Sequence, residues 1–229
     1  GADQALADFE RRHADDPLVM DKWFAVQAMR AQDRTHFFGI VPNLYGVVAG
    51  DSGDPQADQR AVATVDAVQN RLWLDATLRG HYPEEIVAQQ QRFGADDAVH
   101  SGDLEIIAQP LDVLGVNYYS QYHVEGTPAT PGTEPGQSGM EHVRHLPPPE
   151  PRTAMGWSIE PHGLRDILVR LHREWQAPPL MITENGAAFD DVVTNGAVHD
   201  EARRDYLITH IHAVAEAIEA GVDVRGYFA

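Results

Sequence analysis

The stretch PPLMITENGAAFDD, from Pro178 to Asp191, decides how the rest of the chain is interpreted. Two prolines are followed by the apolar run Leu180–Ile182, by Thr183, and then by Glu184, where the apolar character ends. A short apolar run bounded by turn-forming and polar residues is typical of a buried strand. The stretch therefore predicts a strand that carries a carboxylate at its carboxyl end.

Two further segments, Phe37–Asn43 and Leu111–Ser120, have the same form, with apolar residues first and polar residues at the end. A fourth strand is predicted over residues 223–229. Helices are predicted before and between these strands, where apolar side chains recur at helical spacing. They are 1–35, about 59–79, a shorter helix after Pro83, Pro161–Trp175 and Glu201–Ala220. Apolar strands that alternate with helices predict an α/β fold with a parallel sheet covered by helices.

The expected domain organisation is a single domain over residues 1–229. Within it, residues 1–20 form a helical lead-in that matches no recognisable pattern. Residues 121–156 are dense in proline, glycine and threonine and are expected to form one long loop. A loop of this length is uncommon in a compact domain unless it is functional or disordered.

Composition excludes several classes of function. The 229 residues include 35 acidic and 17 basic side chains, and the formal net charge of −18 repels nucleic acids and anionic membranes. There is no cysteine, which removes thiolate metal sites and thiol nucleophiles. The twelve histidines are scattered without a ligand pattern, and we expect no metal and no cofactor. No charged and then apolar leader opens the chain and no apolar run is long enough to span a bilayer, so a cytoplasmic protein is expected.

Polar side chains stand at the ends of the predicted strands, and a parallel sheet brings those ends to one edge. They are Asn43, Asn117, Tyr119 and Glu184. Amides and carboxylates bond sugar hydroxyls in pairs, and an ionised glutamate attacks an anomeric carbon. From residue types alone, the alternative for Glu184 is an exposed turn glutamate, which is what most glutamates are.

Five segments, in order along the chain, are similar to motifs of glycoside hydrolase family 1, the β-glucosidase family. They are NRLWLDATLRGHYPEEI (Asn70–Ile86), LDVLGVNYYS (Leu111–Ser120), TAMGWSIEPHGL (Thr153–Leu164), TENG (Thr183–Gly186), and DEARRDY (Asp200–Tyr206) with the later VRGYFA. Asn70 and Asp75 match the first motif, whereas Ala76 stands where the family usually has proline. The match covers the chain from about Trp23 to its last residue.

The resemblance implies a (β/α)8 TIM barrel, of which the four predicted strands are the fifth to the eighth. It implies that Glu184 is the catalytic nucleophile and that Tyr119 donates a hydrogen bond to it. Asn117 and Asn43 are then expected in the sugar-binding end of the barrel, and Trp157 on the aglycone side. Structural alternatives remain: a strand residue with a satisfied hydroxyl for Tyr119, a strand-end cap for Asn117, and a core side chain for Trp157.

The family's acid/base glutamate lies in an Asn-Glu-Pro motif at the end of the fourth strand, and this sequence contains no Asn-Glu-Pro. The chain is therefore expected to be a fragment of a retaining β-glucosidase that carries the nucleophile, with poor or no activity on its β-glycoside substrates. The alternative is an inactive fragment or pseudo-enzyme that pairs with an amino-terminal half. Self-association through the open barrel edges is also expected.

Overall fold

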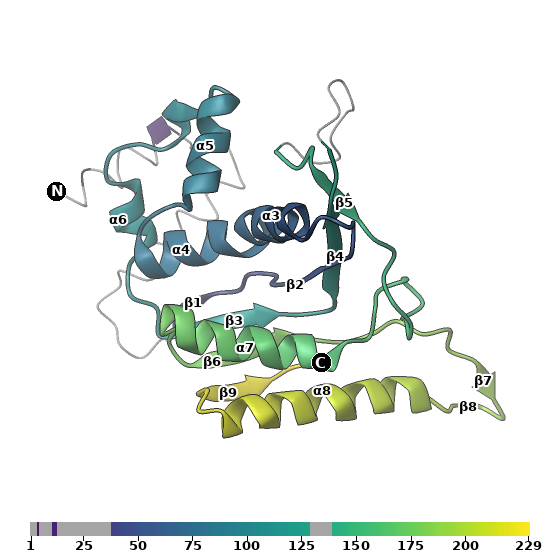
Figure 1. Ribbon diagram of the computed structural model, residues 1–229. Coiled ribbons are helices and arrows are strands. Elements are labelled where there is room, and N and C mark those ends of the chain that lie inside the picture. The colour runs from purple at the N-terminus through teal and green to yellow at the C-terminus, as the bar shows by residue number, and fades with distance from the viewer. Residues whose placement is uncertain (1–3, 5–10, 13–37, 129–138) are drawn as a thin grey trace.

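The computed structural model describes residues 4, 11–12, 38–128 and 139–229 (Figure 1). A parallel four-stranded sheet lies at its centre, in the order β1-β3-β6-β9. Its strands are β1 (Gly39–Ile40), β3 (Val113–Asn117), β6 (Leu180–Glu184) and β9 (Val224–Tyr227). The predicted α/β fold with a parallel sheet is confirmed. The helix predicted over 1–35 lies almost wholly outside the described residues.

The first strand is shorter than predicted because of a proline. Pro42 lacks a backbone N–H, so the chain leaves the ladder after Ile40 and returns as a single parallel bridge between Asn43 and Asn117. The carbonyl of Pro42 still accepts from the backbone N–H of Asn117 at 3.1 Å. Asn43 therefore remains beside the end of β3 even though it is not in a strand.

The helices follow the predicted order. They are α3 (Pro55–Asp66), the π-turn η1 (Ala67–Arg71), α4 (Leu72–Arg79), α5 (Glu84–Arg92), the 3-10 turn η2 (Asp96–Ala98), α6 (Asp103–Ile107), α7 (Pro161–Trp175) and α8 (Glu201–Glu219). The helix predicted from about 59 begins earlier, because Asp54 caps it by accepting from two backbone N–H groups and Pro55 is its first residue. Helices α7 and α8 lie side by side along the sheet (Figure 1).

A second sheet corrects the expectation of one unbroken loop over 121–156. Its strands are β2 (Gly46–Ala49), β4 (Gln121–Gly126) and β5 (Val143–His145), in the order β2-β4-β5. In β4, Tyr122 and Val124 pack on apolar side chains of α3, and this alternation holds the strand in place. Composition concealed β4, because the proline and glycine residues between β4 and β5 and after β5 dominate the segment. A short hairpin, β7 (Val193–Thr194) and β8 (Ala197–Val198), follows β6.

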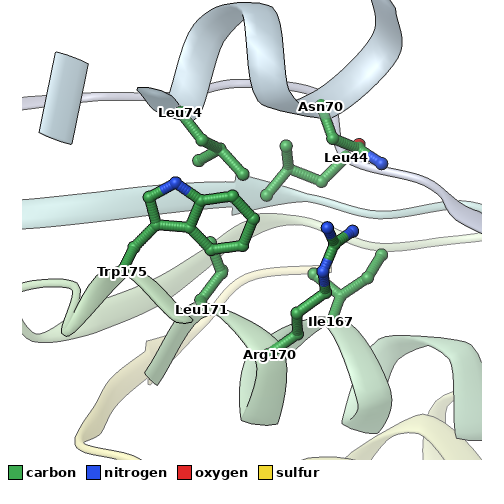
Figure 2. A pocket seen from close by; sticks show the side chains of 7 residues that line it. All are labelled: Leu44, Asn70, Leu74, Ile167, Arg170, Leu171 and Trp175. Carbon is green, nitrogen blue, oxygen red and sulfur yellow. The ribbon is translucent and has the colours of Figure 1, made fainter. Parts of the chain in front are cut away.

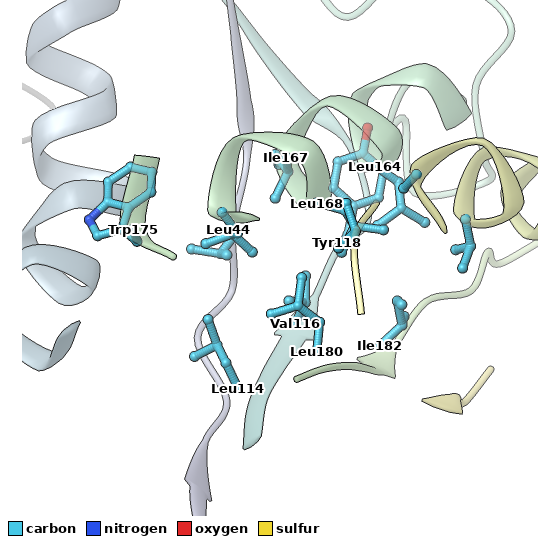
Figure 3. Close-up of a cluster of buried hydrophobic side chains, with 14 of the residues drawn as sticks. Leu44, Leu114, Val116, Tyr118, Leu164, Ile167, Leu168, Trp175, Leu180 and Ile182 are labelled. Atoms are coloured by element: carbon cyan, nitrogen blue, oxygen red, sulfur yellow. The ribbon is translucent and has the colours of Figure 1, made fainter. Parts of the chain in front are cut away.

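The main core lies on one face of the parallel sheet. Figure 3 shows Leu114, Val116 and Ile182 pointing toward side chains of α7, among them the fully buried Leu168. Burial of such a side chain contributes about 1.5–3 kcal/mol. On the opposite face Val41 is 52% exposed, and within the described residues no helix covers that face.

A buried carboxylate joins the helices behind the sheet. Asp66 accepts two hydrogen bonds from the guanidinium of Arg170, at 2.6 and 2.9 Å, and one from Asn70 at 2.8 Å. The Asn70 amide also donates to the carbonyl of Tyr45 at 2.8 Å and accepts from its N–H at 3.0 Å. This network fixes the segment that follows Asn43 onto the helix layer.

Figure 2 shows a small cavity on the same side of the sheet, between α4 and α7. Its volume of about 10 Å³ is room for about one water molecule. The lining residues are Leu44, Asn70, Leu74, Ile167, Arg170, Leu171 and Trp175. The cavity is a packing defect between α4 and α7, and it is too small for a ligand.

Replacement of Asp66 by asparagine tests the hydrogen-bond network that joins the helices behind the sheet. Burial raises the pKa of Asp66, but Arg170, Asn70 and Arg71 outweigh burial and lower that pKa below its ordinary value. A carboxyl with a lowered folded-state pKa stabilises the fold above its unfolded-state pKa, about 3.9, and this stability is lost as pH falls through the folded-state pKa. We expect Asp66→Asn to lower the free energy of unfolding at pH 7 by about 2–3 kcal/mol and to flatten its decline below about pH 4.

Urea unfolding at several pH values measures both effects. Asp205→Asn is the matched control, since Asp205 pairs with Arg204 and both side chains are exposed. The control should leave the free energy of unfolding nearly unchanged. Equal losses of unfolding free energy in the two variants would contradict the role of Asp66 in joining these helices.

Candidate active site

The carboxyl ends of β1, β3 and β6 are held in register by backbone hydrogen bonds. The N–H of Leu44 donates to the carbonyl of Asn117 at 2.9 Å, and the N–H of Tyr118 donates to the carbonyl of Glu184 at 3.0 Å. These bonds bring the polar strand ends that the sequence singled out to one edge of the sheet.

The carboxylate of Glu184 is exposed at this edge and has one side-chain partner in the structure. The hydroxyl of Tyr119 donates to its Oε2 at 2.6 Å. This hydrogen bond, together with burial and the charge of Glu184, raises the pKa of Tyr119 to about 12. The phenol therefore keeps its proton at neutral pH and acts as a donor. One carboxylate oxygen is held by Tyr119, and no described side chain is hydrogen-bonded to the other.

An aromatic wall stands beside this pair. The ring of Trp157 lies 5.3 Å from the ring of Tyr119, centre to centre, with the planes tilted by 57°. Trp157 is half-buried and lies outside the main core, so the core alternative does not describe its place. Two backbone contacts with Thr153 hold it: its carbonyl accepts from the Thr153 N–H at 2.9 Å and its N–H donates to Thr153 Oγ1 at 3.4 Å.

The two asparagines differ in their surroundings. Asn117 is buried, and its Oδ1 accepts from the hydroxyl of Thr183 at 2.8 Å, which turns the amide toward β6. Asn43 is exposed and reaches the site through the backbone bridge to Asn117. The structure thus brings Glu184, Tyr119, Asn117 and Asn43 to one edge.

One residue of the site has a role that the sequence did not reveal. Asn185 is buried, and its amide nitrogen donates to the carbonyl of Tyr118 at 2.7 Å and to the hydroxyl of Tyr206 at 3.0 Å. Its Oδ1 accepts from the hydroxyl of Tyr227 at 2.6 Å. Asn185 therefore ties β3, β9 and α8 to the end of β6. Its partners lie in motifs that had been noticed, but nothing in the sequence pairs them.

Two acidic residues, Asp190 and Asp191, follow Glu184 on its loop. Asp191 faces the guanidinium of Arg203 at 3.3 Å. Among the residues described here, no cluster of three or more histidine or acidic side chains has the arrangement of a metal site. In the same part of the chain, no helix has the length and apolar character required to cross a membrane.

Comparison with known proteins gives a consistent result. The glycosyl hydrolase family 1 model matches residues 11–229. A bifunctional beta-D-glucosidase/beta-D-fucosidase of Bifidobacterium breve is 44% identical over 186 residues, which are 76% of this chain and 40% of the relative. Thermostable beta-glucosidase B of Thermobispora bispora is 47% identical over 171 residues, 72% of this chain and 33% of the relative.

Solved structures give the same family likeness. A psychrophilic beta-glucosidase from Micrococcus antarcticus superposes with a TM-score of 0.77 and 40% identity over 98% of this chain and 49% of that one. A family 1 beta-glucosidase from Thermotoga maritima superposes with a TM-score of 0.76 and is 34% identical in sequence. The match covers 90% of this chain and 44% of that one. The chain spans half or less of the length of these relatives. The parallel sheet is accordingly part of a barrel.

The bond between Tyr119 and Glu184 can be tested by titration. Replacement of Glu184 by glutamine removes the negative charge that opposes the phenolate, so the pKa of Tyr119 should fall from about 12. We expect the ¹³Cζ resonance of Tyr119 in the Glu184→Gln variant to begin its titration at a lower pH than in the parent chain. NMR of tyrosine-labelled chain measures this, and Tyr119→Phe assigns the resonance by removing it. An unchanged titration would contradict the hydrogen bond.

Proposed function

Since the chain belongs to glycosyl hydrolase family 1, we propose that it carries the nucleophile half of a retaining β-glucosidase site, with Glu184 as the nucleophile. The observation that carries the proposal is the 2.6 Å hydrogen bond from Tyr119 to Glu184 at the carboxyl edge of the sheet. The activities in the names of the relatives favour β-D-glucosides as the substrate class.

The proposed chemistry follows from the free oxygen of Glu184. This oxygen attacks the anomeric carbon, the glycosidic C–O bond breaks, and the sugar becomes covalently attached to Glu184. Tyr119 holds the other carboxylate oxygen, so the attacking one is oriented. Trp157 offers a flat wall to the leaving-group side, and Asn117 and Asn43 offer amides to sugar hydroxyls. Water later releases the sugar with its original configuration.

A second carboxyl group must protonate the leaving oxygen, at about 5–5.5 Å from the nucleophile. No Asn-Glu-Pro segment occurs in the 229 residues, and Asp190 and Asp191 lie on the same loop as Glu184 without a motif of their own. We therefore assign the acid/base to residues outside this sequence. General acid catalysis contributes about 10²–10⁴-fold, and without it these residues alone hydrolyse ordinary glucosides slowly or not at all.

The open sheet favours a second proposal, that this chain associates through its uncovered surfaces. Within the described residues, β1 and β9 each pair on one side only. The face of the sheet opposite to the helices exposes Val41. Such edges pair with other chains, so an amino-terminal half or a second copy of this chain is the proposed partner.

The nucleophile can be tested without an acid. We expect a 2-deoxy-2-fluoro-β-glucoside with a dinitrophenyl leaving group to add one glycosyl unit to the chain at Glu184. The phenolate leaves with the bonding electrons and needs no proton, while the fluorine slows release of the sugar. Intact mass followed by peptide mapping measures the adduct.

Two variants serve as controls for this test. Glu184→Gln should form no adduct. Tyr119→Phe should form it about 10- to 100-fold more slowly, because a hydrogen bond to a charged group contributes about 1.5–3 kcal/mol. No adduct on the folded parent chain, with or without added amino-terminal half of a relative, would refute the proposed nucleophile.

Association can be tested by sedimentation. We expect the chain to associate as its concentration rises, and more strongly at high salt, because salt screens the repulsion between chains of net charge −18. Val41→Lys should weaken association by placing a charge on the uncovered face. Val192→Lys, at an exposed residue beside the hairpin, is the control. A monomer at all concentrations and salts would count against the proposal.

A further inference from the structure

A second group of polar side chains lies behind the site, around Glu160. Glu160 occupies the N-cap position of α7, yet its side chain makes no capping hydrogen bond. It is 8% exposed and turns away from the helix toward β4. Burial of a carboxylate is costly unless hydrogen bonds compensate for it, so the partners of Glu160 indicate what it does.

The carboxylate accepts from three side chains. Gln121 Nε2 donates to its Oε1 at 2.8 Å, His123 Nε2 lies 3.1 Å from both oxygens, and the hydroxyl of Ser158 donates to Oε2. Burial raises the pKa of the Glu160 carboxyl, but the bonds from Ser158, His123 and Gln121 outweigh burial and lower that pKa below its ordinary value. Glu160 is therefore an ionised acceptor at neutral pH.

The path of Gln121 to this carboxylate is fixed by two glycines. A Cβ added at Gly46 would lie 2.1 Å from Oε1 of Gln121, and one added at Gly163 would lie 2.6 Å from its Cδ. Glycine at these two positions leaves room for the Gln121 side chain, in its observed conformation, between β2 and α7. The hydrogen bond from Gln121 then joins Glu160 to β4.

The same residue touches the catalytic edge at two points. Its backbone carbonyl accepts from the hydroxyl of Tyr118 at 2.7 Å, beside Tyr119 in the chain. Its carboxylate holds Ser158, the residue directly after Trp157. We infer that Glu160 is a positioning residue: by holding Ser158, its carboxylate keeps the ring of Trp157 on Tyr119 and so sets the aromatic wall beside Glu184. The meaning of this wall for sugar binding rests on the proposed function.

A competing explanation is that the turn before Trp157 is held by its own hydrogen bonds, without help from Glu160. Thr153 makes two backbone contacts with Trp157, and the N–H of Ala154 donates to the carbonyl of Ala188 at 2.8 Å. If these bonds are sufficient, loss of the Glu160 carboxylate will not move Trp157. The two explanations therefore give opposite results for one measurement.

The measurement is ¹⁹F NMR of the whole chain labelled with 5-fluorotryptophan, with Trp157→Phe to assign the Trp157 resonance. We expect Glu160→Ala to shift or broaden the Trp157 resonance and to leave those of Trp73 and Trp175 in place. Ser158→Ala, which removes only the link to Trp157, should reproduce the effect and covers the case in which Glu160→Ala fails to fold. Glu219→Gln, an exposed carboxylate late in α8, is the control.

The outcomes separate cleanly. An unmoved Trp157 resonance in a folded variant, or equal movement of all the tryptophan resonances, overturns the inference. In the glycosyl adduct assay, Glu160→Ala should raise the probe concentration for half-maximal rate about two- to tenfold, as expected for loss of one aromatic contact, with little change in the maximal rate. Absence of an adduct on the parent chain would refute the proposed nucleophile, whereas the ¹⁹F result would still decide the role of Glu160.

Discussion

The carboxyl edge of the parallel sheet depends on the side chain of one buried residue, Asn185. Because water does not reach this amide, each of its polar atoms needs a partner inside the protein. It finds them in the carbonyl of Tyr118 and the hydroxyls of Tyr206 and Tyr227. With Asn185 fixed inward, the preceding Glu184 is directed to the open edge. The carboxylate stands where the strand ends because its neighbour is anchored to three other elements.

The sequence predicted those parts of the fold that depend on local pattern. Helix α7 begins at Pro161 and ends at Trp175 as expected, because its apolar spacing and its proline at the first turn are local signals. The small sheet was missed, since the packing that stabilises β4 comes from α3, which lies far away in the sequence. The partners of Asn185 were missed for the same reason, because its hydrogen bonds join residues that are distant in the sequence.

The site also divides into features that the sequence predicted and features that only the contacts reveal. The resemblance to family motifs identified Glu184 and Tyr119, and the structure places their side chains 2.6 Å apart. It also gives a structural role to other residues of these motifs. Asn70 binds both backbone groups of Tyr45, and Asp75 accepts from the indole N–H of Trp175 at 2.7 Å. These two residues hold helices behind the sheet. A motif therefore mixes residues at the open edge of the sheet with residues that hold helices behind it, and the contacts distinguish the two kinds.

On the face of the sheet opposite to the helices, side chains pack over glycines of the neighbouring strand, and this reduces the apolar surface exposed to water. A Cβ added at Gly115 would lie 2.7 Å from Cγ2 of Val41, and one at Gly226 would lie 3.1 Å from Cγ of Met181. The larger side chains thus lie over glycines of neighbouring strands and fill part of the barrel interior from one side. Each such contact removes apolar area from water without a partner half. The sheet can therefore keep its strands in order although, among the described residues, β1 and β9 each pair on one side only.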